Sequence, residues 1–326
     1  MDGAPVRNKT FSWKDAFFAS PGPQTLKSAL LLYVKGICMG SADIIPGVSG
    51  GTIALITGIY EKLLLAIKSV DTSTARKVLA FDIKGAIAGV HIRFLLCLFL
   101  GIGTAIISLA RLMNYLLHNY SVFTWSLFFG LIAASVLVVG KRVDKWNPGT
   151  AIFFLAGAAA AYFIVNLIPV STPENSWFIF FSGTLAICAM ILPGLSGAFI
   201  LLILGKYEFI TATLKNPFSV ENILIILIFC SGCLVGLLGF SRVLNYLIHK
   251  YHGLTLAFLT GLMAGCMQKI WPWKQVLEVR IINGHEQVLW GGNTLPPGID
   301  IYVVAAVGLA ILGFIAVIVL EKLSDE

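Results

Sequence analysis

Long apolar segments dominate the chain, and charged residues are largely confined to the short segments between them. The segments FLLCLFLGIGTAIISLA (94–110) and IYVVAAVGLAILGFIAVIVL (301–320) reach the roughly 17–25 apolar residues that a helix needs to cross a bilayer. Lipid offers backbone polar groups no partner, so only helices or a closed barrel span it, and strand-like alternation is absent. The sequence therefore predicts an all-α polytopic membrane protein.

The chain contains two similar halves. The segment IPGVSGGTIALITGIYE (45–61) recurs as LPGLSGAFILLILGKYE (192–208), with ten of seventeen positions identical. A second block, RLMNYLLHNY (111–120), recurs as RVLNYLIHKY (242–251), with six of ten identical. Self-similarity of this kind predicts two units with the same architecture.

Each half opens with a short apolar stretch that ends at Pro-Gly-x-Ser-Gly. Some 15 residues make a helix about 22 Å long, which is short of the roughly 30 Å bilayer core. Proline and glycine stop a helix and allow a reversal, so we interpret each stretch as a re-entrant hairpin. Two full spans per hairpin is the alternative. The expected units are a polar amino-terminal segment 1–27 that could lie on the membrane surface; repeat 1 at 28–170, with hairpin 28–66 and spans 94–117, 122–140 and 151–170; and repeat 2 at 177–320, with hairpin 177–208 and spans 223–248, 254–269 and 301–320.

The basic residues predict an orientation for this layout. With a cytoplasmic amino terminus, 16 of the 23 Lys and Arg fall on the inner side, and the carboxyl terminus is cytoplasmic too. Three crossings separate the hairpins, so the repeats are expected to be inverted. Inverted repeats with broken helices are typical of transporters that alternate access to a central site. The net charge of +7 is spread over short loops, which does not indicate a nucleic-acid partner.

The half-helix after each break begins with unpaired backbone N–H groups, which suit an anion and phosphate above all. Glycines allow close approach of a ligand, and hydroxyl groups add donors. The alternative is that glycine and serine only cap and pack the hairpin. The predicted phosphate-binding residues are Gly47, Ser49, Gly50, Gly51 and Thr52 at the first break, and Gly194, Ser196 and Gly197 at the second.

Charged residues within the apolar segments are further candidates. Arg111 and Arg242 occupy matched positions in the repeats, and guanidinium groups bind phosphate bidentately; snorkelling to the interface is the alternative. Intramembrane carboxylates are functional candidates, including for coupling to protons. The predicted coupling or ion-pair residues are Lys35, Asp43, Glu61 and Glu208. Histidine spacing indicates no metal site, we expect no cofactor, and the six cysteines are expected to pack in the apolar segments.

The strings GSADIIPGVSGGTIALITGIYEKLL and ILPGLSGAFILLILGKYE resemble the bacterial DUF368 family, whose members are regarded as polyprenyl-phosphate transporters. The resemblance covers about residues 28–320. It implies a flippase that returns undecaprenyl phosphate, the lipid carrier of cell-wall synthesis, from the outer to the cytoplasmic leaflet of the inner membrane. Proton or sodium coupling is an open part of this expectation, as is the oligomeric state.

Two other functions compete with this interpretation. Undecaprenyl-diphosphate phosphatases carry a similar Pro-Gly-x-Ser-Arg-Ser motif, but Gly50 and Gly197 stand where their arginine would be. Phosphoryl transfer needs that positive charge, so the sequence favours a transporter over an enzyme. A secondary transporter of a small anion is the third possibility; it predicts a polar path closed to lipid, whereas a lipid carrier needs a cavity that opens sideways.

Overall fold

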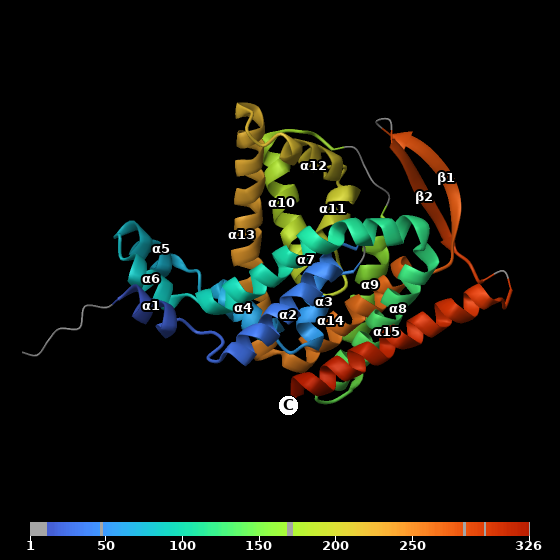
Figure 1. The fold of residues 1–326 in the computed structure, drawn as a ribbon, viewed down its shortest axis with the longest axis horizontal. Coiled ribbons are helices and arrows are strands. Elements are labelled where there is room, and N and C mark those ends of the chain that lie inside the picture. The colour runs from blue at the N-terminus through green and yellow to red at the C-terminus, as the bar shows by residue number, and fades with distance from the viewer. Residues whose placement is uncertain (1–11, 46–47, 168–171, 283–284, 297, 326) are drawn as a thin grey trace, which may run out of the picture.

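The computed structural model describes residues 12–45, 48–167, 172–282, 285–296 and 298–325 (Figure 1). Within these residues, six helices are long and apolar enough to cross a membrane, or up to eight spans if each of two bent helix pairs counts as one. The expected multi-pass membrane protein with helical spans is confirmed at this level. The six are α7 (Ile92–Asn119), α8 (Ser121–Lys141), α9 (Pro148–Val165), α13 (Val220–Lys250), α14 (His252–Cys266) with the following 3-10 turn η1 (Met267–Ile270), and α15 (Ile301–Asp325).

The shorter helices lie between and before these spans. Helix α10 ends at the second Pro-Gly-x-Ser-Gly segment, and α2 ends just before the first, whose Pro46 and Gly47 lie outside the described residues. The bounds are α1 (Trp13–Ala19), α2 (Leu26–Asp43), α3 (Gly50–Ile56), α4 (Tyr60–Lys68), α5 (Thr72–Leu79) and α6 (Ile83–Gly89) in the first half, and α10 (Ser176–Ile191), α11 (Gly197–Ile203) and α12 (Tyr207–Lys215) in the second.

Side-chain caps fix where several helices begin. Thr25 and Ser28 form a capping box at the start of α2, and Asn147 and Thr150 form another at the start of α9, with Pro148 in the first turn. Each cap satisfies amide groups that the first turn of a helix leaves without a partner. The starts of these helices are thus encoded locally, before any packing against neighbours.

The two bent helix pairs have the same geometry. The angle between α3 and α4 is 115°, and the angle between α11 and α12 is also 115°. Gly58 lies at the first bend with φ 68° and Gly205 at the second with φ 62°, a left-handed conformation that favours glycine. These glycines are equivalent in the sequence repeat, so the repeat encodes the same turn twice.

Helix packing is also matched between the halves. Helix α2 packs along α7 as α10 packs along α13, while α8 packs along α15 as α14 packs along α9. In Figure 1, α15 runs beside α8 and α2 lies next to α7. Each interface relies on repeat-equivalent glycines: a Cβ at Gly101 would overlap the carbonyl of Tyr33, and a Cβ at Gly232 would overlap the carbonyl of Phe180. Small residues that let backbones approach are typical of helix contacts in membranes.

This close approach gives the first prediction. Gly101→Ala should destabilise the fold by about 1–3 kcal/mol, the usual cost of overpacking, because α2 and α7 must separate. The matched control is Gly103→Ala on the same helix, where an added Cβ meets nothing within 4 Å. Thermal unfolding of the two purified variants in one detergent measures the difference. Equal melting temperatures would contradict the packing described here.

A two-stranded antiparallel hairpin, β1 (Lys274–Ile282) and β2 (His285–Asn293), precedes α15. It lies in the polar segment between the last two spans and is the one element with strands among the described residues. The sequence analysis did not predict it. Hydropathy identifies membrane helices by their length, whereas a short hairpin outside the membrane has no comparable signal.

Candidate functional site

The first break separates α2 from α3, and polar groups on both sides of the undescribed residues 46–47 are bonded within the protein. The N–H of Gly50 donates to Asp43 Oδ1 at 2.7 Å, and the N–H of Gly51 donates to Ser49 Oγ at 3.1 Å. A Cβ at Gly50 would lie 2.5 Å from Asp43 Oδ2, so glycine makes room for the carboxylate. Asp43 therefore occupies the position where the sequence analysis expected an external anion.

The second break separates α10 from α11 and lacks such an internal anion. Ser196 is the N-cap of α11 but its hydroxyl accepts no capping hydrogen bond. Among the described residues, the backbone N–H groups of Gly197, Ala198 and Phe199 have no protein acceptor. Met190 stands at the position equivalent to Asp43, which explains the difference. The second break thus keeps the donors that the first break has already used.

The two breaks contact each other directly. Ser49 Oγ donates to the carbonyl of Leu192 at 3.1 Å, and the N–H of Gly194 donates to Thr52 Oγ1 at 2.9 Å. Ser49 and Thr52 are 1% and 0% exposed, so their hydroxyl groups face the second hairpin rather than a ligand. The last carbonyls of α10, which have no partner inside the helix, are satisfied by the first hairpin.

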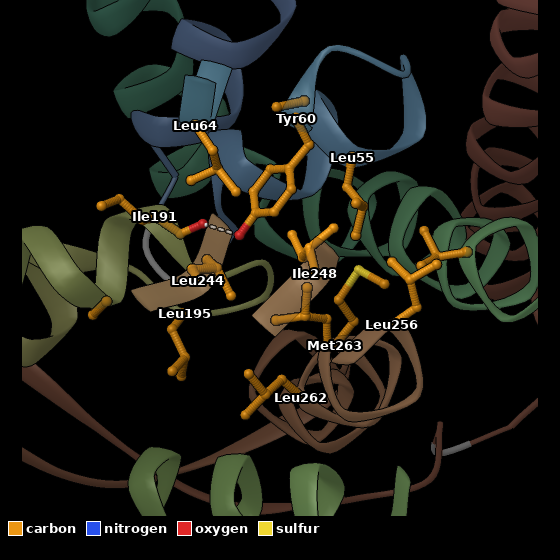
Figure 2. Close-up of a cluster of buried hydrophobic side chains, with 14 of the residues drawn as sticks. Leu55, Tyr60, Leu64, Ile191, Leu195, Leu244, Ile248, Leu256, Leu262 and Met263 are labelled. Atoms are coloured by element: carbon orange, nitrogen blue, oxygen red, sulfur yellow. Dashed lines mark hydrogen bonds between the residues drawn. The ribbon is translucent and has the colours of Figure 1, made fainter. Parts of the chain in front are cut away.

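Tyr60 extends this contact into the hydrophobic core. Its hydroxyl donates to the carbonyl of Ile191 at 3.0 Å, and the ring is surrounded by Leu64, Leu244 and Ile248 (Figure 2). Tyr60 is only 2% exposed, so water does not compete for the bond. The core is therefore built around the place where the two hairpins meet.

The second prediction concerns this hydrogen bond. Tyr60→Phe should lower the free energy of unfolding by about 1–3 kcal/mol, because the carbonyl of Ile191 stays buried without a donor. Tyr302→Phe is the control, since Tyr302 is 68% exposed and its hydroxyl has no hydrogen bond in the described residues. Thermal unfolding in detergent distinguishes them. A Tyr60 variant as stable as the control would show that the bond between hairpins contributes little.

A cavity of about 420 Å³ lies beside the breaks, and we call it the break cavity. Asp43 and Ser196 form its polar part, and the ends of α2 and α10 meet α7, α11 and α12 around it. Apart from Tyr207, its remaining lining is apolar and partly exposed at the surface of the protein: Ile106 is 45%, Met190 40% and Leu202 37% exposed. The cavity therefore joins a polar end to an apolar opening, which suits an amphipathic ligand.

The two matched arginines do not line the break cavity. Arg242 donates to the carbonyl of Leu238 at 2.7 Å and to the carbonyl of Val70 at 3.1 Å, and Arg111 is exposed on α7. The structure thus separates them from the breaks with which the sequence analysis grouped them. Arg242 instead links α13 to the turn that follows α4.

The other charged candidates are dispersed as well. Lys35 donates to the carbonyl of Thr57 at 2.7 Å, and Asp43 forms no ion pair with it in the described part of the chain. Glu61 lies 3.8 Å from His252 Nε2. Glu208 lies in the first turn of α12, as Glu61 does in α4. Of the predicted set, Asp43 and Ser196 are the pair that the break cavity brings together.

Helix α4 is fastened to α13 by polar contacts. Lys68 Nζ donates to Asn245 Oδ1 at 3.3 Å, next to the bond from Arg242 to Val70. The repeat-equivalent helices α12 and α7 have no comparable packing in the residues that the structure describes. Yet their sequences carry the same residue types at the equivalent positions, Lys215, Asn114 and Arg111. In the described residues, α4 therefore packs on α13, whereas α12 does not pack on α7.

Sequence reasoning missed the apolar residues of the break cavity and the contact between α4 and α13. Met190 and Ile106 look like ordinary lipid-facing positions, because nothing in their hydropathy marks a cavity. The signal for Lys68 and Asn245 was present in the repeat, since both have equivalents in the other half. A comparison of every polar residue between the halves would have identified them.

Known proteins resemble this chain over most of its length. A family model described as undecaprenyl phosphate translocase-like matches residues 39–288. A Vibrio cholerae protein named polyprenyl-phosphate transporter is 44% identical over 259 residues, which cover 79% of this chain and 83% of that protein. A Staphylococcus aureus protein of the same name is 28% identical over 253 residues, covering 73% and 85% respectively. No solved structure gives a significant match.

Proposed function

The chain belongs to the undecaprenyl phosphate translocase-like family, and we propose that it carries undecaprenyl phosphate from the outer to the cytoplasmic leaflet of the bacterial cytoplasmic membrane by alternating access. Transport of a polyprenyl-phosphate carrier lipid follows from the family and its named relatives. The direction, the mechanism and the residues involved are our proposal.

The observation that carries the proposal is the break cavity. Its lining includes Ser196 and Ala198 at the start of α11, where a hydroxyl and a backbone N–H are donors suited to phosphate oxygens. Its opening is lined by exposed apolar residues, so the isoprenoid chain can remain in lipid while the phosphate is bound. A lipid with a small anionic headgroup matches both parts.

Asp43 is our candidate for coupling. Its carboxylate is bonded to Gly50 and also borders the break cavity, so a phosphate bound at Ser196 would lie near a second negative charge. Protonation of Asp43 removes that repulsion. Binding of the lipid and uptake of a proton would then favour each other.

The contacts support the expected inversion of the two hairpins, and the basic residues are what assign a side of the membrane to each. Glu61, Asp144 and His252 lie together, at the end of the molecule where α8 ends and α14 begins. Thr172, which follows α9, instead donates to the carbonyl of Leu204 at the second bend. The first hairpin would then return on the cytoplasmic side and the second on the outer side, as inverted repeats require.

In this orientation, the contact between α4 and α13 closes the cytoplasmic side, and the gap between α12 and α7 leaves the break cavity open outward. We propose that in the other state of the cycle α12 packs against α7 and α4 separates from α13. Lys215 and Asn114 would approach each other as Lys68 and Asn245 separate. Arg111 and Arg242 would act on either side of the membrane as parts of these contacts.

The test is transport by the purified protein in vesicles. Labelled undecaprenyl phosphate is reconstituted in both leaflets, and a phosphatase that cannot cross the membrane is added outside. We expect dephosphorylation to stop at the outer-leaflet pool in protein-free vesicles and to proceed to near completion with the protein. Identical plateaus would refute the proposed transport.

The competing enzyme has less support. A side chain at Gly50 would collide with Asp43, and a Cβ at Gly197 would lie 2.6 Å from the carbonyl of Ala186. An arginine at position 50 would displace the Asp43 carboxylate, and one at position 197 would require the backbone to shift, so both breaks are built around glycine rather than the arginine of such a phosphatase. Release of phosphate from undecaprenyl diphosphate by the purified protein would favour the enzyme. A small-anion carrier is disfavoured because the break cavity opens onto an apolar surface.

A further inference from the structure

A second cavity, of about 450 Å³, lies between α2, α4 and the start of α7, and we call it the lysine cavity. Lys35, Lys62 and His91 contribute its basic groups. Lys35 and Asp43 are eight residues apart on α2, or about 12 Å at about 1.5 Å per residue. The lysine cavity and the break cavity therefore lie towards opposite ends of α2.

The positive charge of this cavity is not balanced by its own lining. No Asp or Glu contributes to the lining among the described residues. Lys62 forms no ion pair in the same part of the chain, and Lys62 and Arg142 lie near enough to Lys35 to repel its ammonium group. Arg142 donates to the carbonyls of Leu55 and Ile56, at the end of α3. An anion would relieve this repulsion.

His91 gives an independent indication of a ligand. Its Nδ1 is buried and has no hydrogen-bond partner among the described residues, although the side chain lines the cavity. A buried polar atom without a partner is uncommon and costly. Burial also lowers the pKa of His91, so the neutral ring can donate from Nδ1 at physiological pH. Because Nδ1 itself is covered, the ring must turn towards the cavity before a phosphate oxygen can accept that bond.

The apolar part of the lining continues onto the surface of the protein. Leu31 is 53% and Leu65 37% exposed, and the neighbouring Leu30 and Val34 on α2 are 60% and 45% exposed. A ligand with its headgroup among the basic residues could therefore extend an apolar chain along α2. This arrangement favours a lipid over free inorganic phosphate.

We propose that the lysine cavity binds the phosphate of a polyprenyl monophosphate on the cytoplasmic side, as a second station after the break cavity. This inference rests on the proposed function. A phosphate monoester carries a charge of about −1.5 to −2 at pH 7 and three acceptor oxygens, which matches several basic groups better than the single charge of a phosphodiester. The two cavities would then hold the headgroup before and after its passage.

Photo-cross-linking in vesicles tests the proposal. Benzoylphenylalanine is incorporated at position 31 for the lysine cavity, at position 202 for the break cavity, and at position 304 on the exposed surface of α15 as background. Radiolabelled undecaprenyl phosphate is the probe. We expect both cavity positions to be labelled well above position 304.

Charge reversal then identifies the headgroup interaction. Lys62→Glu should reduce labelling at position 31 at least about tenfold, an effect of about 1.4 kcal/mol, and leave position 202 labelled. Lys141→Glu, at an exposed lysine of α8, is the matched control and should change neither.

The outcomes separate the two proposals. Labelling at position 202 without labelling at position 31 would overturn the lysine cavity alone. Absence of labelling at both would count against the proposed function. Equal displacement of the probe by excess phosphatidylglycerol would indicate a general anionic-lipid site, and displacement by inorganic phosphate would indicate a phosphate site; either would overturn the assignment to a polyprenyl monophosphate.

Discussion

Met190→Asp is expected to reduce transport at least about tenfold while leaving the protein folded. Position 190 is equivalent to Asp43, and Met190 lines the break cavity at 40% exposure. An aspartate there can accept from the free N–H groups at the start of α11, as Asp43 accepts from Gly50. The second break would then carry its own anion, and phosphate would meet a like charge at short range. We expect at least about a tenfold loss of transport, since about 1.4 kcal/mol suffices for that factor.

Two substitutions at the same position separate charge from shape. Met190→Leu should transport as the parent protein does. Met190→Asn has nearly the shape of aspartate without the charge, so it should retain more transport than Met190→Asp. The vesicle assay measures all three, and size-exclusion profiles with melting temperatures establish that they are folded. Normal transport by the aspartate variant would remove the second break from the binding site.

Linking positions 68 and 245 is expected to stop transport reversibly. Lys68 and Asn245 hold α4 against α13, and the proposed cycle requires them to separate. In a variant without the six native cysteines, Lys68→Cys and Asn245→Cys are joined by a short cleavable bis-maleimide. The reagent spans the gap between two helices whose long side chains meet, where a direct disulfide would need closer backbones. Cleavage of the linker should restore transport.

The repeat-equivalent pair provides the complementary observation. Lys215→Cys and Asn114→Cys should react with the same reagent only in the opposite state, so linking this pair should also stop transport. Single-cysteine variants treated in parallel control for modification alone. Full transport by protein linked at positions 68 and 245 would contradict the alternating contacts. Because linking is detected on the protein itself, its result does not depend on which lipid is carried.

The long helices and the places where helices end could be predicted from the sequence. Apolar runs gave six long helices, and the Pro-Gly-x-Ser-Gly segments coincide with the ends of helices. Residues that are equivalent in the repeat also adopt the same local structure, since Gly58 and Gly205 lie at bends of equal angle. These features depend on local sequence and on the length of a bilayer-spanning helix, which a single sequence reveals.

The candidate site was less accessible, because it depends on which side chain reaches which group. Asp43 was recognised as a candidate, but its bond to Gly50 follows from a rotamer and a close approach that hydropathy does not encode. Arg242 was predicted to bind phosphate because of its charge. In the structure it contacts Leu238 and Val70 instead, and the packing of α13 sets these contacts. Inverted topology and the roles of these residues remain predictions for the experiments above.

Asp43 also matters for the step of the proposed cycle in which the carrier returns without a lipid. A carrier must return empty, and uncovered amide groups inside a bilayer are costly during that step. In the proposed cycle, the Asp43 carboxylate on the Gly50 N–H would substitute for a bound lipid at that helix end of the first hairpin. The second hairpin has no such substitute, so the unloaded reorientation would be limited by α11 rather than by α3.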